Sequence, residues 1–222
     1  MSRTNANESR YFSGYLGHER WLSYVHQISV VADLNPCSII EIGVGPGVKG
    51  MMARATFPEC QYTAVDIDPA LGPDVSADVR RLPFADDSFE VGYCCQVLEH
   101  IPYADFLVGL SELRRICGCR VVISLPDVTP FLYLRARPPS SRRILPWLWK
   151  GISLPSFLPK PHNFDDHGQH YWEIGKRGYS LRRILDDIRT LQWHDVRHFR
   201  MIERSYWHFF VLDIAARASE TR

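Results

Sequence analysis

A short glycine-rich run early in the chain most strongly limits what this sequence can fold into. Residues 41–47 read Glu-Ile-Gly-Val-Gly-Pro-Gly and directly follow the apolar stretch 37–40. Glycine tolerates the positive φ angles of a tight turn and, because it lacks a Cβ, lets backbone amides approach a ligand closely. We therefore predict a buried strand that ends in a ligand-binding turn, followed by a helix over residues 48–56.

The spacing of these glycines separates two classes of ligand. A dinucleotide fingerprint requires Gly-x-Gly-x-x-Gly, in which the third glycine lets the helix pack closely on the strand. Here Val48 occupies that position, and Gly47 comes one residue early. An NAD-dependent oxidoreductase is therefore disfavoured and stays open only as an alternative.

Three further segments follow in a fixed order. The strand-like run 62–67 carries an aspartate near its end, where a carboxylate can accept hydrogen bonds from a ribose diol. Residues 77–90 lead into the next strand, and residues 97–101 read Val-Leu-Glu-His-Ile. With the glycine run, these segments resemble the class I S-adenosylmethionine-dependent methyltransferases, and the last one is similar to the small-molecule branch called type 11. The resemblance is tight over residues 37–126 and loose elsewhere.

The resemblance implies S-adenosyl-L-methionine as the cofactor and assigns nine residues to it. Its methionine end would be bordered by Glu41, Gly43, Gly45 and Gln96, with Gly47 completing the turn, while its ribose and adenine would be held by Asp66, Ile67, Asp78 and Val79. Each assignment has a plainer alternative. The glycines would then form an ordinary turn, the aspartates a solvated strand end or a turn cap, and Glu99 and His100 a cap of the next helix.

The remaining pattern predicts alternating strands and helices. Helices are expected at 16–34 (with Trp21, Val25, Ile28 and Val31 on the apolar face), 104–116 and 179–190, and strands at 89–95, 119–125, 192–200 and 206–215. Such alternation indicates a doubly wound α/β sheet. The resemblance refines this to a Rossmann-like, seven-stranded, mostly parallel sheet with an antiparallel C-terminal strand. We expect residues 1–222 to form a single domain.

Composition excludes several classes of function. A net charge of +1 argues against a general nucleic-acid binder, and a hydrophobic content of 45% supports a sizeable core. None of the six cysteines shows the Cys-x-x-Cys spacing of a zinc site, so reduced thiols in a cytoplasmic protein are expected. The first ten residues lack the apolar core of a signal peptide, and no run reaches the 18 or so apolar residues of a membrane span.

An insert at about residues 131–163 departs from this composition. It holds six cations, six prolines and no acidic residue, interleaved with large apolar side chains that include Trp147 and Trp149. Loops of this length in a compact domain are usually functional or disordered. We expect a lid on the substrate side, or alternatively a basic surface at residues 135–160 that contacts a membrane interface or an anionic acceptor.

The next segment, 162–179, is dense in histidine, carboxylate and aromatic residues. If the acceptor is a hydroxyl, His167 or His170 could act as the general base, because imidazole titrates near neutral pH, and Glu173 could orient it. A metal site that includes Asp165 or Asp166 is a disfavoured alternative, and a loop with purely local hydrogen bonds is another. The favoured assignment includes no metal.

The acceptor is only partly indicated. Nitrogen acceptors in DNA are often marked by Asn/Asp-Pro-Pro-Tyr, but here residues 95–98 read Cys-Gln-Val-Leu. Residues 170–175 and 176–179 resemble a subgroup loosely associated with surface polysaccharides or natural products. We therefore expect oxygen methylation of a small molecule or saccharide, with a non-catalytic cofactor-binding or scaffold protein of the same fold as the alternative. Alignment and exclusion of water would supply most of the catalysis.

Overall fold

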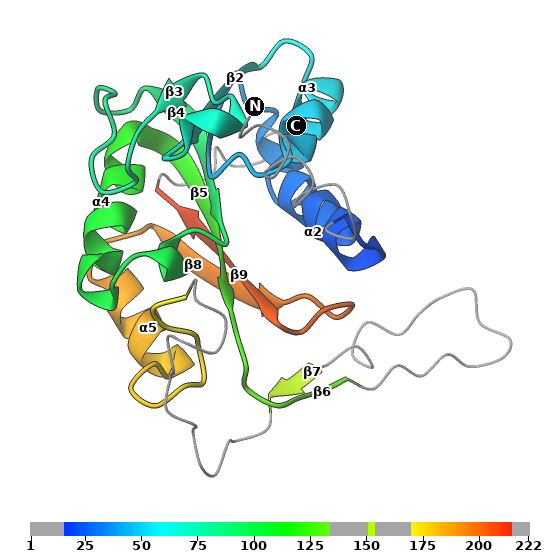
Figure 1. Cartoon of the computed structure of the whole chain (residues 1–222), viewed down its shortest axis with the longest axis vertical. Helices are drawn as coiled ribbons and strands as arrows, with labels where there is room; N and C mark the ends of the chain where they lie inside the picture. The colour runs from blue at the N-terminus through cyan, green and yellow to red at the C-terminus, as the bar shows by residue number, and fades with distance from the viewer. Residues whose placement is uncertain (1–15, 134–150, 154–169, 215–222) are drawn as a thin grey trace, which may run out of the picture.

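The protein folds around one seven-stranded sheet flanked by helices on both faces (Figure 1). The computed structural model describes residues 16–133, 151–153 and 170–214. In chain order the sheet strands are β1 (Ser38–Ile42), β2 (Gln61–Asp66), β3 (Val75–Ser76), β4 (Phe89–Cys95), β5 (Cys117–Pro126), β8 (Asp195–Arg200) and β9 (Trp207–Asp213). The helices are α2 (His18–Ser29), α3 (Val48–Thr56), α4 (Phe106–Ile116) and α5 (Leu181–Arg189).

The strands lie in the order β3-β2-β1-β4-β5-β9-β8. All pairs from β3 to β5 are parallel, whereas β9 runs antiparallel to both β5 and β8. This confirms the predicted doubly wound, mostly parallel sheet of seven strands with an antiparallel C-terminal strand. The order reverses between β1 and β4, and open α/β sheets bind ligands at such a switch point, beyond the carboxyl ends of the strands.

Successive residues of the buried strands serve two separate cores. Ile39 packs in the core that receives α2 and α3, while Ile40 packs in the core that receives α4 and α5. In Figure 1 the two helix pairs lie on opposite sides of the sheet. Because side chains alternate across a strand, a sheet covered on both faces buries consecutive residues, as Ile39 and Ile40 show.

The first described helix, α2, lies within the range that the sequence predicts. The residues on its buried face differ in part from the prediction. Trp21 and Val25 are 43% and 47% exposed, so the predicted apolar stripe is wrong for these two residues. Ile28 and Val31 are buried as predicted, and Tyr24 and Gln27 take the inward positions instead of Trp21 and Val25. Two polar or partly polar residues therefore point inward, toward the cavity described below.

The insert is described only at its two ends. β6 (Phe131–Tyr133) follows β5 and pairs antiparallel with β7 (Gly151–Ser153). Residues 134–150 and 154–169 lie outside the described residues, as do His167, the basic segment and the tryptophans of the insert. The lid and the membrane contact thus stay predictions. Among the described helices, none combines the length and apolar character that crossing a membrane requires.

Candidate functional site

The glycine run forms the turn that the sequence predicts. Gly43, Gly45 and Gly47 adopt φ angles of 85°, 52° and 73° between the end of β1 and the start of α3. A Cβ at Gly43 would collide with Cγ2 of Val97, whereas a Cβ at Gly45 would meet nothing within 4 Å. Gly43 is therefore required by packing, while Gly45 leaves open space next to its backbone.

A cavity of about 520 Å³ opens beside this turn, at the carboxyl ends of β1, β2 and β4. Eight of the nine residues predicted to hold the cofactor line it: Glu41, Gly43, Gly45, Asp66, Ile67, Asp78, Val79 and Gln96. The ninth, Gly47, is not among the lining residues and precedes α3 as its N-cap. The cavity volume falls within the range of about 300–1,000 Å³ that is usual for small-molecule sites.

Glu41 is buried at the floor of this cavity with two partners. Nζ of Lys49 lies 2.8 Å from its Oε1, and the hydroxyl of Tyr62 donates to its Oε2. Burial lowers the pKa of Lys49, but the Glu41 carboxylate outweighs burial and leaves that pKa raised. Lys49 therefore stays a cation and lies against a Glu41 side chain that is 2% exposed.

Asp66 ends β2 and faces the glycine turn. Its two oxygens accept hydrogen bonds from the backbone N–H groups of Val44 and Asp68, each at 2.9 Å. A carboxylate oxygen has two acceptor positions, so both oxygens keep capacity for a ligand hydroxyl. Ile67, next in the chain, is 70% exposed and offers an apolar surface at the cavity edge.

Asp78 also reaches the cavity but is already engaged. It accepts from Nε of Arg80 at 3.0 Å and from Nη2 at 2.6 Å, and the backbone N–H of Arg80 donates to the same carboxylate. The hydrogen bonds from Arg80 hold the pKa of Asp78 below its usual range, although partial burial opposes them. Asp78 thus caps a local turn, as the plainer alternative predicted. Its ionised carboxylate also borders the cavity.

Gln96 adopts a left-handed backbone with φ of 57° just after β4. Its N–H donates to the carbonyl of Ser124 at 2.9 Å, and Nε2 donates to Oγ of the same serine at 3.3 Å. These bonds tie the end of β4 to β5. They position Gln96 at the cavity, as predicted, in a conformation that asparagine and glycine adopt more readily.

Several lining residues were missed from the sequence. They come from α2, the start of α3 and β9, and include Arg20, Ser23, Tyr24, Gln27, Lys49 and Trp207. The guanidinium of Arg20 lies 4.9 Å from the ring centroid of Trp207, which closes that side of the cavity. One sequence signal could have indicated that α2 lines the cavity. Ser23 and Gln27 are polar residues four positions apart, so they lie on the same face of this helix.

The segment that carries His170 is fixed by a neighbouring tryptophan. Trp172 is fully buried, and its indole N–H donates to the carbonyl of Ile101 at 3.1 Å. The N–H of Tyr171 donates to the carbonyl of Glu99 at 2.8 Å, and Ile174 bridges to Asp127, which directly follows β5. His170 is thereby held against the loop that follows β4, about seventy residues earlier in the chain.

His170 and Glu173 form the pair that the sequence predicts. Nδ1 of His170 lies 2.9 Å from Oε1 of Glu173, which also accepts from the hydroxyl of Tyr206 at 2.6 Å. Burial lowers the pKa of His170, but Glu173 and Glu99 outweigh it and leave that pKa raised. Burial raises the pKa of Glu173, yet the bonds from His170 and Tyr206 leave it lowered.

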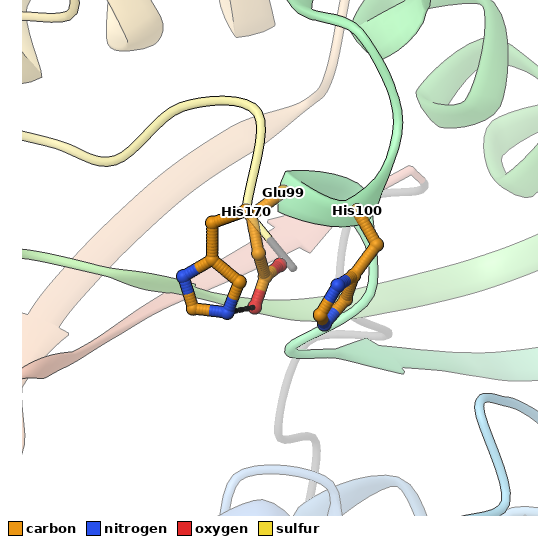
Figure 2. Close-up of side chains that lie close together, drawn as sticks. All are labelled: Glu99, His100 and His170. Atoms are coloured by element: carbon orange, nitrogen blue, oxygen red, sulfur yellow. Dashed lines mark ion pairs between the residues drawn. The ribbon is translucent and has the colours of Figure 1, made fainter. Parts of the chain in front are cut away.

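Glu99 and His100 lie beside His170 (Figure 2). Oε1 of Glu99 is 4.0 Å from Nε2 of His170, and the rings of His100 and His170 have centroids 4.9 Å apart. Glu99 and His100 lie in the short helix η3 (Leu98–His100), and the next α-helix, α4, has no side-chain cap, so the predicted capping role is not seen there. His100 also lines the cavity, which connects the histidine cluster to the predicted cofactor residues.

Glu99 is unusual within this group. It is fully buried, and neither of its carboxylate oxygens has a hydrogen-bond partner in the part of the chain that the structure describes. Burial raises its pKa to about 8, although the nearby His170 opposes the shift. Buried polar groups are almost always satisfied, so an unsatisfied carboxylate marks a place where a further partner is missing.

Comparisons with known proteins agree with this geometry. Residues 40–118 match the type 11 family of methyltransferase domains. A search of curated protein sequences found no significant match.

Solved structures with the same fold include a Burkholderia thailandensis 1,6-didemethyltoxoflavin-N1-methyltransferase with bound 1,6-didemethyltoxoflavin and S-adenosylhomocysteine. It has a TM-score of 0.63 at 11% identity, over 96% of this chain and 85% of that one. A methyltransferase from Aquifex aeolicus that depends on S-adenosylmethionine has a TM-score of 0.54 at 11% identity, over 97% and 100%. Haemonchus contortus phosphoethanolamine N-methyltransferase 2, in complex with S-adenosyl-L-methionine, has a TM-score of 0.58 at 15% identity, over 96% and 57%.

Proposed function

We infer that this chain, which carries a class I S-adenosylmethionine-dependent methyltransferase domain, methylates an oxygen of a small molecule or saccharide. One observation carries the proposal. The cavity lined by the glycine turn and Asp66 is bordered by His100, and His100 packs against the His170–Glu173 pair. The cavity assigned to the cofactor and the proton-accepting His170 are therefore neighbours joined by His100, which lines the cavity and contacts the ring of His170.

The residues present fit the cofactor. Gly45 leaves room beside its backbone for the methionine end, and the fixed carboxylate of Asp66 has acceptor capacity for the ribose hydroxyls. The exposed Ile67 would pack on the adenine, while Asp78 and the backbone of Val79 would bind the adenine edge. Glu41 and Gln96 would border the amino-acid end, and Gly47 would complete the turn.

When bound, the cofactor supplies a methyl group on a positively charged sulfur. In the transfer, the bond from carbon to sulfur breaks, its electron pair stays on sulfur, and a new bond from carbon to the acceptor oxygen forms. The acceptor hydroxyl must lose its proton. The protein contributes by aligning the acceptor, by excluding water and by accepting that proton.

His170 is the residue that we assign to the proton. Its Nδ1 is paired with Glu173, which turns Nε2 toward Glu99 and the loop that carries His100. Glu173 is in turn held by Tyr206, so the orientation of the imidazole is fixed by two successive hydrogen bonds. His167, the other predicted base, lies outside the described residues and stays a prediction from sequence.

The choice of oxygen depends on the sequence after β4 and on this histidine pair. Residues 95–98 lack the Asn/Asp-Pro-Pro-Tyr run that often marks nitrogen acceptors in DNA, and no large positive net charge is present for a nucleic-acid substrate. A base is most useful for a hydroxyl, which must be deprotonated on transfer. A saccharide acceptor and a cytoplasmic location remain parts of this proposal, as does the insert as a lid on the substrate side, with a membrane contact at 135–160 as the alternative.

A screen of acceptors tests it. The full chain is incubated with S-adenosylmethionine and panels of matched hydroxyl and amine compounds, including sugars, and release of S-adenosylhomocysteine is measured. We expect product only with hydroxyl acceptors. Turnover restricted to amines would overturn the oxygen assignment, and cofactor binding without any turnover across the panels would favour a non-catalytic binding protein.

A further inference from the structure

We propose that Glu99, His100 and His170 bind a divalent transition-metal cation next to the cofactor cavity. One ligand atom from each of the three side chains lies within 4.8 Å of the others (Figure 2). A cation with bonds of about 2.1 Å would draw such atoms to roughly 3.0–3.4 Å. Modest side-chain rotations would therefore complete the site.

Glu99 provides the independent argument for a missing ligand. Its carboxylate is fully buried and has no hydrogen-bond partner among the described residues, and Figure 2 shows it directed at His170. A buried carboxylate without hydrogen bonds is costly, and a bound cation is one of the few partners that remove this cost. Glu41, a buried carboxylate that does line the cavity, has both of its oxygens engaged by Lys49 and Tyr62.

The surroundings of His170 match those of a metal-bound histidine. Such a histidine usually pairs its second ring nitrogen with a carboxylate, which fixes the tautomer and the ring orientation. Here Nδ1 pairs with Glu173 at 2.9 Å, while Nε2 faces Glu99 at 4.0 Å. Tyr206 donates to the same Glu173 oxygen and completes this outer layer.

The chemistry of the three ligands selects the class of cation. Two imidazole nitrogens and one carboxylate suit Mn²⁺, Fe²⁺, Co²⁺ or Zn²⁺ and leave coordination positions open, whereas Mg²⁺ and Ca²⁺ prefer oxygen ligands. His100 lines the cavity, so an open position would face the acceptor. Binding of the acceptor to the cation rests on the proposed function. A hydroxyl bound to the cation would lose its proton more readily. His170 would then act as a metal ligand instead of the base.

Cation binding is tested on the full chain, freed of any purification tag and stripped by a chelator. Co²⁺ and Zn²⁺ are titrated by calorimetry, the visible absorption of Co²⁺ reports its coordination, and Mg²⁺ is the comparison ion. We expect one Co²⁺ site per chain. Glu99→Gln, His100→Gln and His170→Gln should each weaken it by at least about ten-fold, and Glu173→Gln should weaken it without removing it.

A matched control is the exposed His194, which precedes β8 and lies outside the cluster. His194→Gln should bind Co²⁺ like the wild type, and thermal melting identifies any variant that fails to fold. Absence of Co²⁺ and Zn²⁺ binding to the wild type, or binding that survives in all three cluster variants, overturns the proposal.

Activity separates this proposal from the proposed function. If the chelated enzyme still methylates its acceptor at the full rate, the cation proposal fails while the methyltransferase assignment stands. If Co²⁺ binds at the cluster but S-adenosylmethionine does not bind to the chain, the proposed function fails while the cation site stands.

Discussion

The backbone N–H of Val44 donates to the carboxylate of Asp66 across 2.9 Å, and this bond joins the glycine turn after β1 to the end of β2. A second bond, from Asp68, holds the other oxygen of the same carboxylate. The carboxylate is thus fixed before any ligand binds, so a ribose would meet a preorganised acceptor.

Replacing this carboxylate gives the first prediction. Asp66→Ala should weaken binding of S-adenosylmethionine by about 1–3 kcal/mol, because ribose hydroxyls would lose a buried partner. Asp74→Ala is the matched control, since Asp74 accepts from the N–H of Ala64 on the same strand but does not line the cavity. Calorimetry measures the affinity of both variants for S-adenosylmethionine. If the two variants bind it equally tightly, Asp66 is not part of the cofactor site.

A pair of glycines gives the second prediction. Gly45 and Gly72 have φ angles of 52° and 67°, and a Cβ at either would meet nothing within 4 Å. Valine at either position should therefore cost a similar strain of about 1–2 kcal/mol. Only Gly45→Val should abolish cofactor binding, because only Gly45 lines the cavity. Native far-ultraviolet dichroism with normal binding in Gly45→Val would contradict the assignment of the turn.

The acceptor side gives the third prediction. His170→Gln should lower turnover by about a hundred-fold or more and leave the affinity for S-adenosylmethionine unchanged, because the side chain acts on the acceptor. His194→Gln is the control in both assays. His167→Ala, beyond the described residues, is expected to behave like His170→Gln. A variant at His170 that turns over normally at saturating cofactor would exclude it from the chemistry.

A buried ion pair gives the fourth prediction, on stability. Arg120 is fully buried on β5 and pairs with Asp213 of β9 and with Asp33. Asp213→Ala should destabilise the fold by about 3–5 kcal/mol, because it leaves a buried cation without its closest partner. The exposed Asp186 of α5, which pairs with Arg182, is the control and should cost less than about 1 kcal/mol. Urea denaturation measures both, and comparable losses would refute this account.

Local patterns explain why much of the fold was predictable. A continuous apolar strand, a glycine turn and a helix are specified by neighbouring residues, so β1 and α3 lie where the sequence places them. The predicted helix over 179–190 is α5, and Ser180 caps it by accepting from the N–H of Arg183. These features need no knowledge of distant contacts.

The errors arise where tertiary contacts override local pattern. Apolar periodicity assigns Trp21 and Val25 to the buried face of α2, yet the helix borders the cavity and turns Gln27 inward instead. The cluster of Glu99 with His170 depends on Trp172, whose burial brings the two segments together. No local spacing encodes that contact, so the sequence offered helix capping as one alternative for Glu99 and did not predict its contact with His170.

Cofactor identity is tested most directly by calorimetric titration of the full chain with S-adenosylmethionine and, separately, with NAD⁺. The cavity, the glycine turn and the fixed Asp66 carboxylate predict one saturable site for S-adenosylmethionine, displaced competitively by S-adenosylhomocysteine, and no binding of NAD⁺. Folded protein that binds NAD⁺, or that shows no binding of S-adenosylmethionine, would contradict the account.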